Sequence, residues 1–152
     1  MQVRSIMTQK VNSIGTGDTI LEAAQSMADN DVGVLPVIEA GHLVGIVTDR
    51  DIAVRAIAGG VSPHMPVRRI MSRDVASCSP SDSVEDALGT MANEQVRRLP
   101  VCDDQDRLVG IIGLGDAANR DPDASEVGAT LSDICQPTGL HCQTSSFTPQ
   151  GV

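Results

Sequence analysis

The sequence predicts an α/β (α+β) fold built from two copies of one unit, each with the order strand, helix, strand, strand, helix. The main observation is a repeat: residues 3–7 return as residues 67–71, and Leu35-Pro36-Val37 returns as Leu99-Pro100-Val101, always 64 positions later. In both copies a helical pattern is followed by two β-rich runs joined by a polar turn. A unit of this size cannot bury its apolar face alone, so we expect the functional surface to lie between the copies.

Two helices are indicated by their start signals. In the first copy Thr19-Ile20-Leu21-Glu22 has the pattern of a capping box, and apolar residues follow at helical spacing, which predicts a helix over residues 19–30. Ser83-Val84-Glu85-Asp86 repeats this pattern in the second copy. A further helix is expected over residues 51–58 of the first copy, where Gly59-Gly60 ends it.

The β-rich runs predict a hairpin in each copy, and a short extended piece at residues 13–17 precedes the first helix. Pro36 and Pro100 restrict their strands to sheet edges or strand starts, because proline cannot donate to a ladder. The second hairpin turn is one residue longer than the first, which a surface loop tolerates. The runs cover residues 32–38 and 43–47 in the first copy, and 96–102 and 108–112 in the second.

Beyond Asp116 the repeat ends. Val127, Leu131 and Ile134 recur at helical spacing and predict one more helix packed on the pair. From Gln136 on, polar residues, Pro and Gly dominate without periodicity, so we expect a disordered tail. The expected segments are a first unit at 3–60, a linker at 61–66, a second unit at 67–122, a C-terminal helix at 123–135 and the tail at 136–152.

The composition excludes several classes of partner. The formal net charge is -9, and the chain has no Trp, no Tyr and one Phe, so we expect no nucleic-acid binding. No stretch has the length of a membrane span and the N-terminus lacks a signal-peptide pattern, so we expect a soluble, cytoplasmic protein with no membrane role. Four cysteines without a paired framework fit a reducing cytosol.

No residue set indicates catalysis or a metal. A nucleophile, a base and an orienting group cannot be assembled from this sequence, so we predict that the chain is not an enzyme and requires no cofactor. The three histidines lack metal-ligand spacing, and no metal site is predicted. A redox or metal sensor that uses Cys135, His141 and Cys142 in the tail is a weaker alternative.

The duplicated Leu-Pro-Val strand, together with Gly45-Ile46-Val47-Thr48-Asp49-Arg50-Asp51 after the first hairpin, resembles the CBS domain. This family usually occurs as a tandem pair called a Bateman module, and the resemblance covers residues 3–120. It implies two units related by a pseudo-twofold axis, sheets packed face to face, and commonly a disc-like homodimer. It also implies adenine nucleotides such as AMP or ATP as ligands in clefts between the copies.

The turn after Val47 carries ligand chemistry in the first copy. Exposed amides at a helix N-terminus favour an anion there. Thr48 can donate a hydroxyl hydrogen bond to a phosphate, and Arg50 can fork two phosphate oxygens. Asp51 only accepts, which suits a ribose diol, and the resemblance implies the same contacts for Thr48 and Asp51. The alternative is that Thr48 and Asp51 simply cap the helix that follows.

The second copy departs from this pattern at the equivalent turn. Asp116 keeps the ribose acceptor, but Gly113 and Gly115 stand where the first copy has Thr48 and Arg50. Losing such donors costs roughly 1.5 to 3 kcal/mol each if the phosphate finds no substitute. We therefore expect the second site to be weaker or empty.

Arg97 and Arg98 replace Gly33-Val34 of the first copy, and we expect one of them to reach across the cleft to the phosphate that the first copy holds. The alternative is that both form salt bridges with the acidic surface or a dimer mate. Because the repeats contain no aromatic residue, aliphatic side chains must hold the base, and modest affinity follows. The side chains expected around the base are Ile14, Val32, Val34 and Ile46.

The leading hypothesis is therefore a stand-alone regulatory module that binds an adenosine-containing nucleotide and signals its occupancy to a protein partner. Such signalling requires the ligand to bind two arrangements of the module with different affinity. The alternative is a ligand-free dimeric scaffold that recruits another protein.

Overall fold

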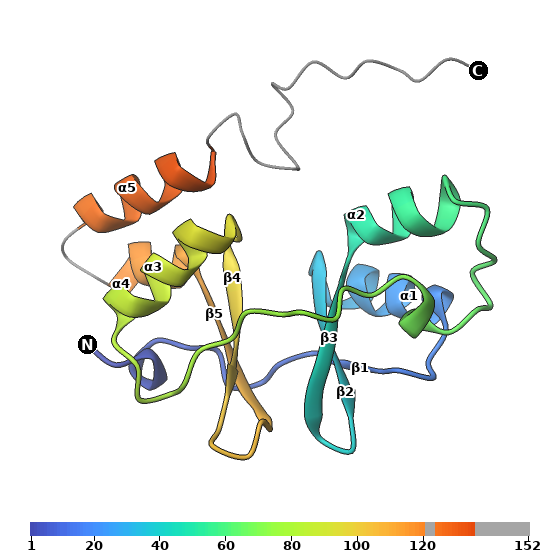
Figure 1. Cartoon of the computed structure of the whole chain (residues 1–152), viewed down its shortest axis with the longest axis horizontal. Coiled ribbons are helices and arrows are strands. Elements are labelled where there is room, and N and C mark those ends of the chain that lie inside the picture. The colour runs from blue at the N-terminus through green and yellow to red at the C-terminus, as the bar shows by residue number, and fades with distance from the viewer. Residues whose placement is uncertain (121–123, 136–152) are drawn as a thin grey trace.

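The structure, a computed structural model, describes residues 1–120 and 124–135. These residues form a pair of α/β units that lie side by side, with a β-hairpin of each at the centre and the helices outside (Figure 1). The predicted α/β class and the repeated unit are confirmed. The tail at 136–152, for which disorder was predicted, lies outside the described residues.

The elements follow the predicted order in the first copy, whereas among the described residues of the second copy an isolated bridge between Cys78 and Val101 stands in place of the first strand. In the first copy a short strand and a helix precede the hairpin, and a helical segment follows it. Its bounds are β1 at Ile14–Gly15, α1 at Ile20–Asn30, β2 at Val34–Glu39, β3 at His42–Thr48 and α2 at Asp49–Asp51, which continues into the π-helical segment η2 at Ile52–Ile57. The second copy contains α3 at Val84–Glu94, β4 at Arg98–Cys102, β5 at Leu108–Gly113 and α4 at Leu114–Arg120, and α5 at Ala124–Ile134 follows it.

The start of α1 is the capping box that the sequence predicts. The Oγ1 of Thr19 accepts a hydrogen bond from the Glu22 amide at 3.1 Å, and the Thr19 amide donates to Glu22 Oε2 at 2.7 Å. In α3 the Oγ of Ser83 accepts from the Asp86 amide at 3.0 Å, and this cap has only the first of the two hydrogen bonds. Both helices are therefore positioned by local signals.

The position of Pro36 differs from the prediction, because β2 is the central strand of the sheet β1-β2-β3 and not an edge. β1 is parallel to β2 but pairs only with Val37 and Ile38. Opposite Pro36 on β3, Ile46 exchanges both of its backbone hydrogen bonds with Ser72 at 2.9 Å. No neighbouring strand therefore needs an N–H at Pro36. Pro100 lies on β4 of the two-stranded sheet, as expected of an edge.

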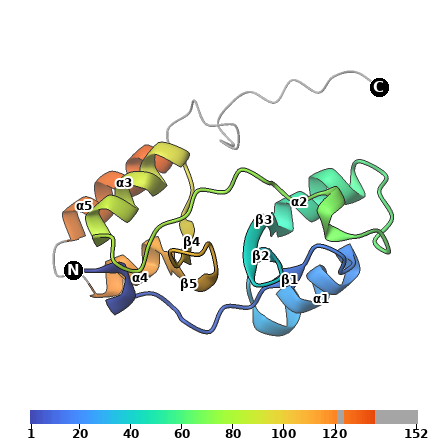
Figure 2. The same ribbon diagram turned by 60° about the horizontal axis from the view of Figure 1, so that its bottom comes forward.

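The N-terminal segments of the two copies, which we call the arms, are exchanged between the units. The first arm runs through Val3–Ser5, a 3-10 turn, to Thr8, and the second runs through the 3-10 turn Val67–Arg69 to Ser72. Thr8 pairs with Ile111 on β5, whereas Ser72 pairs with Ile46 on β3. Figure 2 shows the two connecting segments, blue and green, each running from one unit to the other.

The arms also complete the two hydrophobic cores. Val3 and Ile6 of the first arm are buried in the core of the second copy, among residues of α3, β4 and β5. Val67 and Ile70 of the second arm are buried in the core of the first copy, among residues of α1, β2 and β3. Each core therefore contains side chains from both copies of the repeat.

The C-terminal helix α5 packs against α3 and α4 of the second unit. Val127 is buried as predicted, but Leu131, predicted on the same face, is 43% exposed, and the buried position beside Val127 is Thr130. Thr130 and Leu131 flank the direction of Val127 on opposite sides of the helix, so the buried face of α5 is turned toward Thr130. Among the described residues no helix is long and apolar enough to cross a membrane.

Candidate functional site

Two clefts within the described part of the chain lie between the copies, and the larger of these two has a volume of about 590 Å³. The first copy contributes Thr48, Arg50 and Asp51 from the end of β3 and the start of α2. The second copy contributes polar and charged side chains from its arm and from the start of β4. The lining includes Ser72, Asp74, Arg97 and Arg98 from the second copy, and the apolar walls are formed by Val34, Ile46, Val96 and Pro100.

Thr48 and Asp51 form a capping box at the start of α2. The Asp51 amide donates to Thr48 Oγ1 at 3.1 Å, and the Thr48 amide donates to Asp51 Oδ2 at 2.9 Å. The capping alternative from the sequence is thus correct for these atoms. Both side chains nevertheless line the larger cleft.

The backbone amides of this turn are already paired within the chain, which corrects the expectation that exposed amides would bind the anion of a ligand. Besides the two amides of the capping box, the Asp49 amide donates to the Gly33 carbonyl at 3.0 Å. The Arg50 amide donates to Asp49 Oδ1 at 2.8 Å. Since each N–H has one proton to give, the donors that remain for a ligand are side-chain groups.

Those side-chain donors are the Thr48 hydroxyl and three arginines. Accepting from the Asp51 amide leaves the hydroxyl proton of Thr48 available. Within residues 1–120 and 124–135, Arg50, Arg97 and Arg98 form no ion pair. Arg55 differs, because its Nε lies 3.5 Å from Asp51 Oδ1. Three guanidinium groups without carboxylate partners therefore border one cleft.

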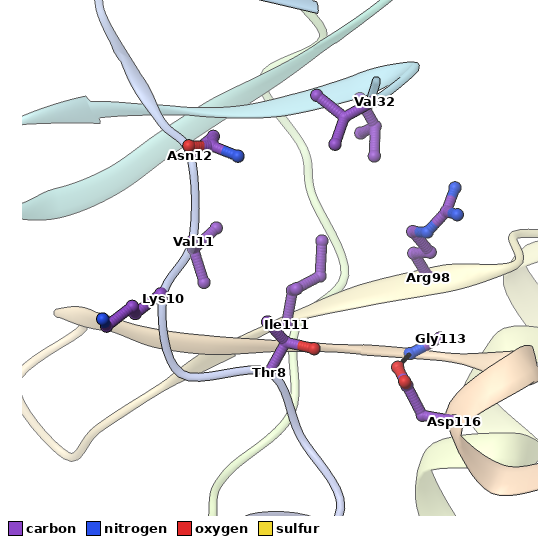
Figure 3. A pocket seen from close by; sticks show the side chains of 10 residues that line it. Thr8, Lys10, Val11, Asn12, Val32, Arg98, Ile111, Gly113 and Asp116 are labelled. Atoms are coloured by element: carbon purple, nitrogen blue, oxygen red, sulfur yellow. Dashed lines mark hydrogen bonds between the residues drawn. The ribbon is translucent and has the colours of Figure 1, made fainter. Parts of the chain in front are cut away.

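The smaller cleft, of about 260 Å³, is the equivalent space on the other side (Figure 3). The Gly113 amide donates to Asp116 Oδ2 at 2.8 Å, which matches the hydrogen bond between Thr48 and Asp51. A glycine supplies no hydroxyl, so the second half of that box and the side-chain donor are missing. The lining also includes Thr8 at the end of the first arm, residues 10–12 that follow it, and Val32, Val34, Arg98 and Ile111.

The structure brings most of the predicted site residues together, but not all of them in one place. The larger cleft contains Thr48, Arg50, Asp51, Arg97, Arg98 and Val34, while Asp116 lies in the smaller cleft with Arg98 and Val34. Ile14 lines neither cleft. Its side chain is 6% exposed and belongs to the core of the first unit, because β1 pairs with Val37 and presents Ile14 to the core.

The sequence reasoning missed the contribution of the arms to the clefts. Lys10 and Asn12 follow the first arm, and Ser72 and Asp74 belong to the equivalent segment of the second. The repeat itself carried a signal, since Lys10 and Asp74 occupy equivalent positions and differ in charge. The predicted site instead rested on mismatches at the hairpins and the turns that follow them.

No group of three or more His, Cys, Asp or Glu side chains that could hold a metal occurs among the described residues. Cys135 is exposed at the end of α5, while His141 and Cys142 lie outside the described residues of the chain. The redox or metal alternative therefore stays a prediction.

The chain is similar to known families and proteins over most of its length. The family model for the CBS domain matches residues 3–57 and 67–123. The CBS domain-containing protein YhcV of Bacillus subtilis is 43% identical over 132 residues, which cover 87% of this chain and 94% of that protein. Hypoxic response protein 1 of Mycobacterium tuberculosis is 34% identical over 139 residues, which cover 90% of this chain and 96% of that protein.

Two solved structures extend the comparison. The crystal structure of Hypoxic Response Protein I with two coordinated zinc ions superposes with a TM-score of 0.75 at 33% identity, covering 80% of this chain and 100% of that one. The CBS domain pair of protein MJ0100, in complex with 5'-methylthioadenosine and S-adenosyl-L-methionine, gives a TM-score of 0.71 at 28% identity. That match covers 78% of this chain and 94% of the MJ0100 chain.

Proposed function

This chain belongs to the CBS domain family as a tandem pair, and from that premise we propose that it is a regulatory module for an adenosine-containing nucleotide. The ligand, of the AMP, ADP or ATP class, binds in the larger cleft, and its presence is signalled to a protein partner. One observation carries the proposal: Arg50, Arg97 and Arg98, none in an ion pair with a described residue, border the same cleft as the Thr48 hydroxyl and the Asp51 carboxylate.

The phosphate of the nucleotide is assigned to the side-chain donors. Arg50 approaches from α2 and Arg97 from the second copy, so a phosphate between them receives guanidinium forks from both sides. Thr48 adds a hydroxyl donor while its oxygen continues to cap α2. Charge-assisted hydrogen bonds of this kind are each worth about 1.5 to 3 kcal/mol.

The ribose is assigned to Asp51. Its side chain is 13% exposed, with Oδ2 accepting from the Thr48 amide and Oδ1 lying 3.5 Å from Arg55 Nε. A carboxylate offers about four lone-pair sites, so these two contacts leave room for the hydroxyls of a ribose. The negative charge of Asp51 also keeps the phosphate on the side of Arg50 and Arg97.

The base is assigned to the aliphatic wall formed by Val34, Ile46 and Val96. These side chains offer apolar contact but no aromatic face, so stacking does not contribute to affinity. The MJ0100 pair, whose structure contains 5'-methylthioadenosine and S-adenosyl-L-methionine, supports the adenosine class of ligand for a related fold.

Signalling is assigned to the exchanged arms. A ligand in the larger cleft lies against Ser72 of the second arm. Ser72 pairs with Ile46 of the first unit, and the chain that follows Ser72 leads into the second unit. A ligand that prefers one arrangement of arm and hairpin shifts the module toward it by its difference in affinity. The face presented to the partner changes with that shift.

Thermal denaturation of the full chain with AMP, ADP, ATP, NAD or S-adenosylmethionine tests the proposal. A ligand present at about 100 times its dissociation constant should raise the melting temperature by roughly 5 to 10 °C. Arg97→Ala should weaken binding in calorimetry, whereas Arg69→Ala serves as the matched control, because Arg69 is exposed and lines neither cleft. No stabilisation by any of these compounds would contradict the proposal.

A dimeric scaffold is the second candidate, and one observation favours it. Val54 and Ile57 on η2 are 50% and 68% exposed, which leaves an apolar surface on the outer side of the first unit. We propose a homodimer that uses this surface. Light scattering should give the mass of a dimer for the native chain and of a monomer for Ile57→Asp, and a native monomer would contradict the scaffold.

A further inference from the structure

Two positions line both clefts, and they are equivalent in the repeat. Val34 at the start of β2 and Arg98 at the start of β4 border the larger and the smaller cleft alike, and within the described chain no other residue is shared by the two linings. The two spaces are therefore neighbours at this point. One of the two shared side chains is apolar and the other is a cation.

Arg98 lies where the second copy lacks its hydroxyl. On the hairpins, Arg98 pairs with Gly113, whereas the equivalent pair in the first copy is Val34 with Thr48. A Cβ on Gly113 would lie 3.4 Å from Arg98 Cγ, so the stem of the arginine packs over the glycine. Figure 3 shows the guanidinium of Arg98 extending into the space between Gly113 and Val32.

The charges around the smaller cleft make Arg98 important there. Lys10 is the other cation of its lining, and Asp116 is the carboxylate. The larger cleft has three arginines in addition to Arg98, and four carboxylates: its other charged lining residues are Arg50, Arg55, Arg97, Asp49, Asp51, Asp74 and Glu94. An anion in the smaller cleft consequently depends on Arg98 more than an anion in the larger one does.

We propose that Arg98 is a specificity-determining residue shared by both clefts, which makes them antagonistic for phosphate-bearing ligands. The inference rests on the proposed nucleotide-binding function. The side chain of Arg98 can extend into one cleft at a time, so a guanidinium fork to a nucleotide in one cleft withdraws Arg98 from the other. Two phosphates drawn to the same guanidinium also repel each other within the screening distance of about 8 to 10 Å. A nucleoside has no phosphate to bind Arg98, so its binding in one cleft does not affect binding in the other.

Isoleucine methyl NMR can follow each cleft separately. Ile46 lines only the larger cleft and Ile111 only the smaller one, and the two are equivalent positions of the repeat. The full chain is titrated with AMP and, separately, with adenosine as the probes. Arg98→Ala should weaken AMP binding by about tenfold at both methyl groups, whereas Arg97→Ala should weaken it at Ile46 alone.

The coupling is measured by disabling the larger cleft. Asp51→Asn removes the ribose acceptor charge there and should tighten AMP binding at Ile111 by about threefold to tenfold, because Arg98 is released. This tightening should vanish when Arg98→Ala is combined with Asp51→Asn. It should also be absent when adenosine replaces AMP.

The outcomes separate this inference from the proposed function. The shared role of Arg98 would be wrong if AMP binding depends on Arg97 but Arg98→Ala weakens it at one methyl group only. It would also be wrong if Asp51→Asn leaves the AMP affinity at Ile111 unchanged. Either result would leave the proposed function standing. Stronger antagonism between the clefts in Arg98→Ala than in the wild-type chain would also overturn the shared role, because it would mean that Arg98 bridges both phosphates in the wild-type chain. A wild-type chain that binds AMP at neither methyl would overturn both.

Discussion

At the scale of the residue, Thr48 has two roles that the sequence presented as alternatives. Its oxygen accepts from the Asp51 amide and caps α2, and its hydroxyl proton remains for a ligand in the larger cleft. A threonine can do both because a hydroxyl accepts and donates at once. In the second copy Gly113 does neither, although its amide still donates to Asp116.

Substitutions at Thr48 can separate these roles. Thr48→Ala should lower the free energy of unfolding by about 1 kcal/mol through loss of the cap. It should also weaken AMP binding by about tenfold or more through loss of the donor. Thr48→Ser keeps both groups and is the matched control. Denaturant unfolding and calorimetry measure the two effects, and AMP affinity equal in Ala and Ser variants would show that Thr48 is only a cap.

The cysteines provide a prediction that is independent of any ligand. Burial, with smaller contributions from Asp82 and Cys102, raises the pKa of the Cys78 thiol from 9.0 to about 12. Burial also raises the pKa of Cys102, whereas Cys135 is exposed. Because the thiolate is the reactive form, only Cys135 should react with a disulfide reagent in native Cys142→Ser protein at pH 8. Rapid native labelling of Cys78 would contradict this.

The same shift gives a dependence of stability on pH. Below pH 9.0 the Cys78 thiol is protonated in both folded and unfolded chains, so its contribution to stability is fully present. Above that pH the unfolded chain releases the proton and the folded chain retains it. The free energy of unfolding should therefore fall between pH 9.0 and about 12, and this slope should be smaller in Cys78→Ser.

The turn at Thr48 shows what a sequence can reveal at this scale. The side chains were predictable because a cap and a ligand contact both follow from residue type and local spacing. The hydrogen-bond partners of the backbone amides were not predictable. The Asp49 amide, for example, donates to the Gly33 carbonyl, which comes close only after β2 and β3 have paired. Ile14 was misplaced for a similar reason, since β1 faces the core through its pairing with β2.

At the scale of the element, a glycine in each hairpin admits the arm of the other copy. A Cβ on Gly45 would lie 2.8 Å from both Met71 Sδ and the Ser72 carbonyl oxygen. A Cβ on Gly110 would lie 2.7 Å from Met7 Sδ and 3.1 Å from the Thr8 carbonyl oxygen. The glycines are thus required by the close approach of a backbone.

Alanine substitution should reveal this requirement. Gly45→Ala should lower the free energy of unfolding by about 1 to 3 kcal/mol, because the second arm must move away from β3. Gly89→Ala is the matched control, since Gly89 lies exposed within α3 with no atom within 4 Å of the added Cβ. That change should stabilise the chain by up to about 1 kcal/mol. Thermal unfolding compares the two, and equal effects would contradict the close contact.

The elements themselves were largely predictable from sequence. The helices α1 and α3 were predicted from their caps, which involve residues three positions apart. The hairpins followed from β-rich runs joined by polar turns. Pro36 could not be placed correctly, because its tolerance in a central strand depends on β1 being short and on Ser72 pairing with Ile46.

At the scale of the whole molecule, the sequence repeat and the structural unit are not the same segments. Each arm packs against the unit of the other copy, and an arginine at equivalent positions of the repeat holds each arm there. Arg55 Nη1 donates to the Ile70 carbonyl at 3.0 Å and to Ser72 Oγ at 3.2 Å. The equivalent Arg120 Nη1 donates to the Ser5 and Ile6 carbonyls at 3.4 Å. Sequence symmetry could not predict the exchange, since both copies carry identical signals and either pairing satisfies them.

Fragments of equal length can test where the structural unit begins and ends. Residues 1–65 contain a whole sequence repeat, whereas residues 9–73 contain the first hairpin, α1 and the arm that completes its core. The second fragment retains Ile70 in the core and the pairing of Ile46 with Ser72. In the first fragment Val3 and Ile6 cannot be buried as in the full chain, because the core that contains them is formed by residues of the second unit.

We therefore expect residues 9–73 to unfold with a cooperative transition in circular dichroism, and residues 1–65 to show a broad, non-cooperative loss of signal. Both fragments are near the size at which a single core is only marginally stable. Whether a fragment folds cooperatively therefore depends on whether it buries the few apolar side chains of its arm. Ile70→Ala in the 9–73 fragment should remove the transition at a cost of about 2 to 5 kcal/mol. A more stable 1–65 fragment would show that each arm packs against its own copy.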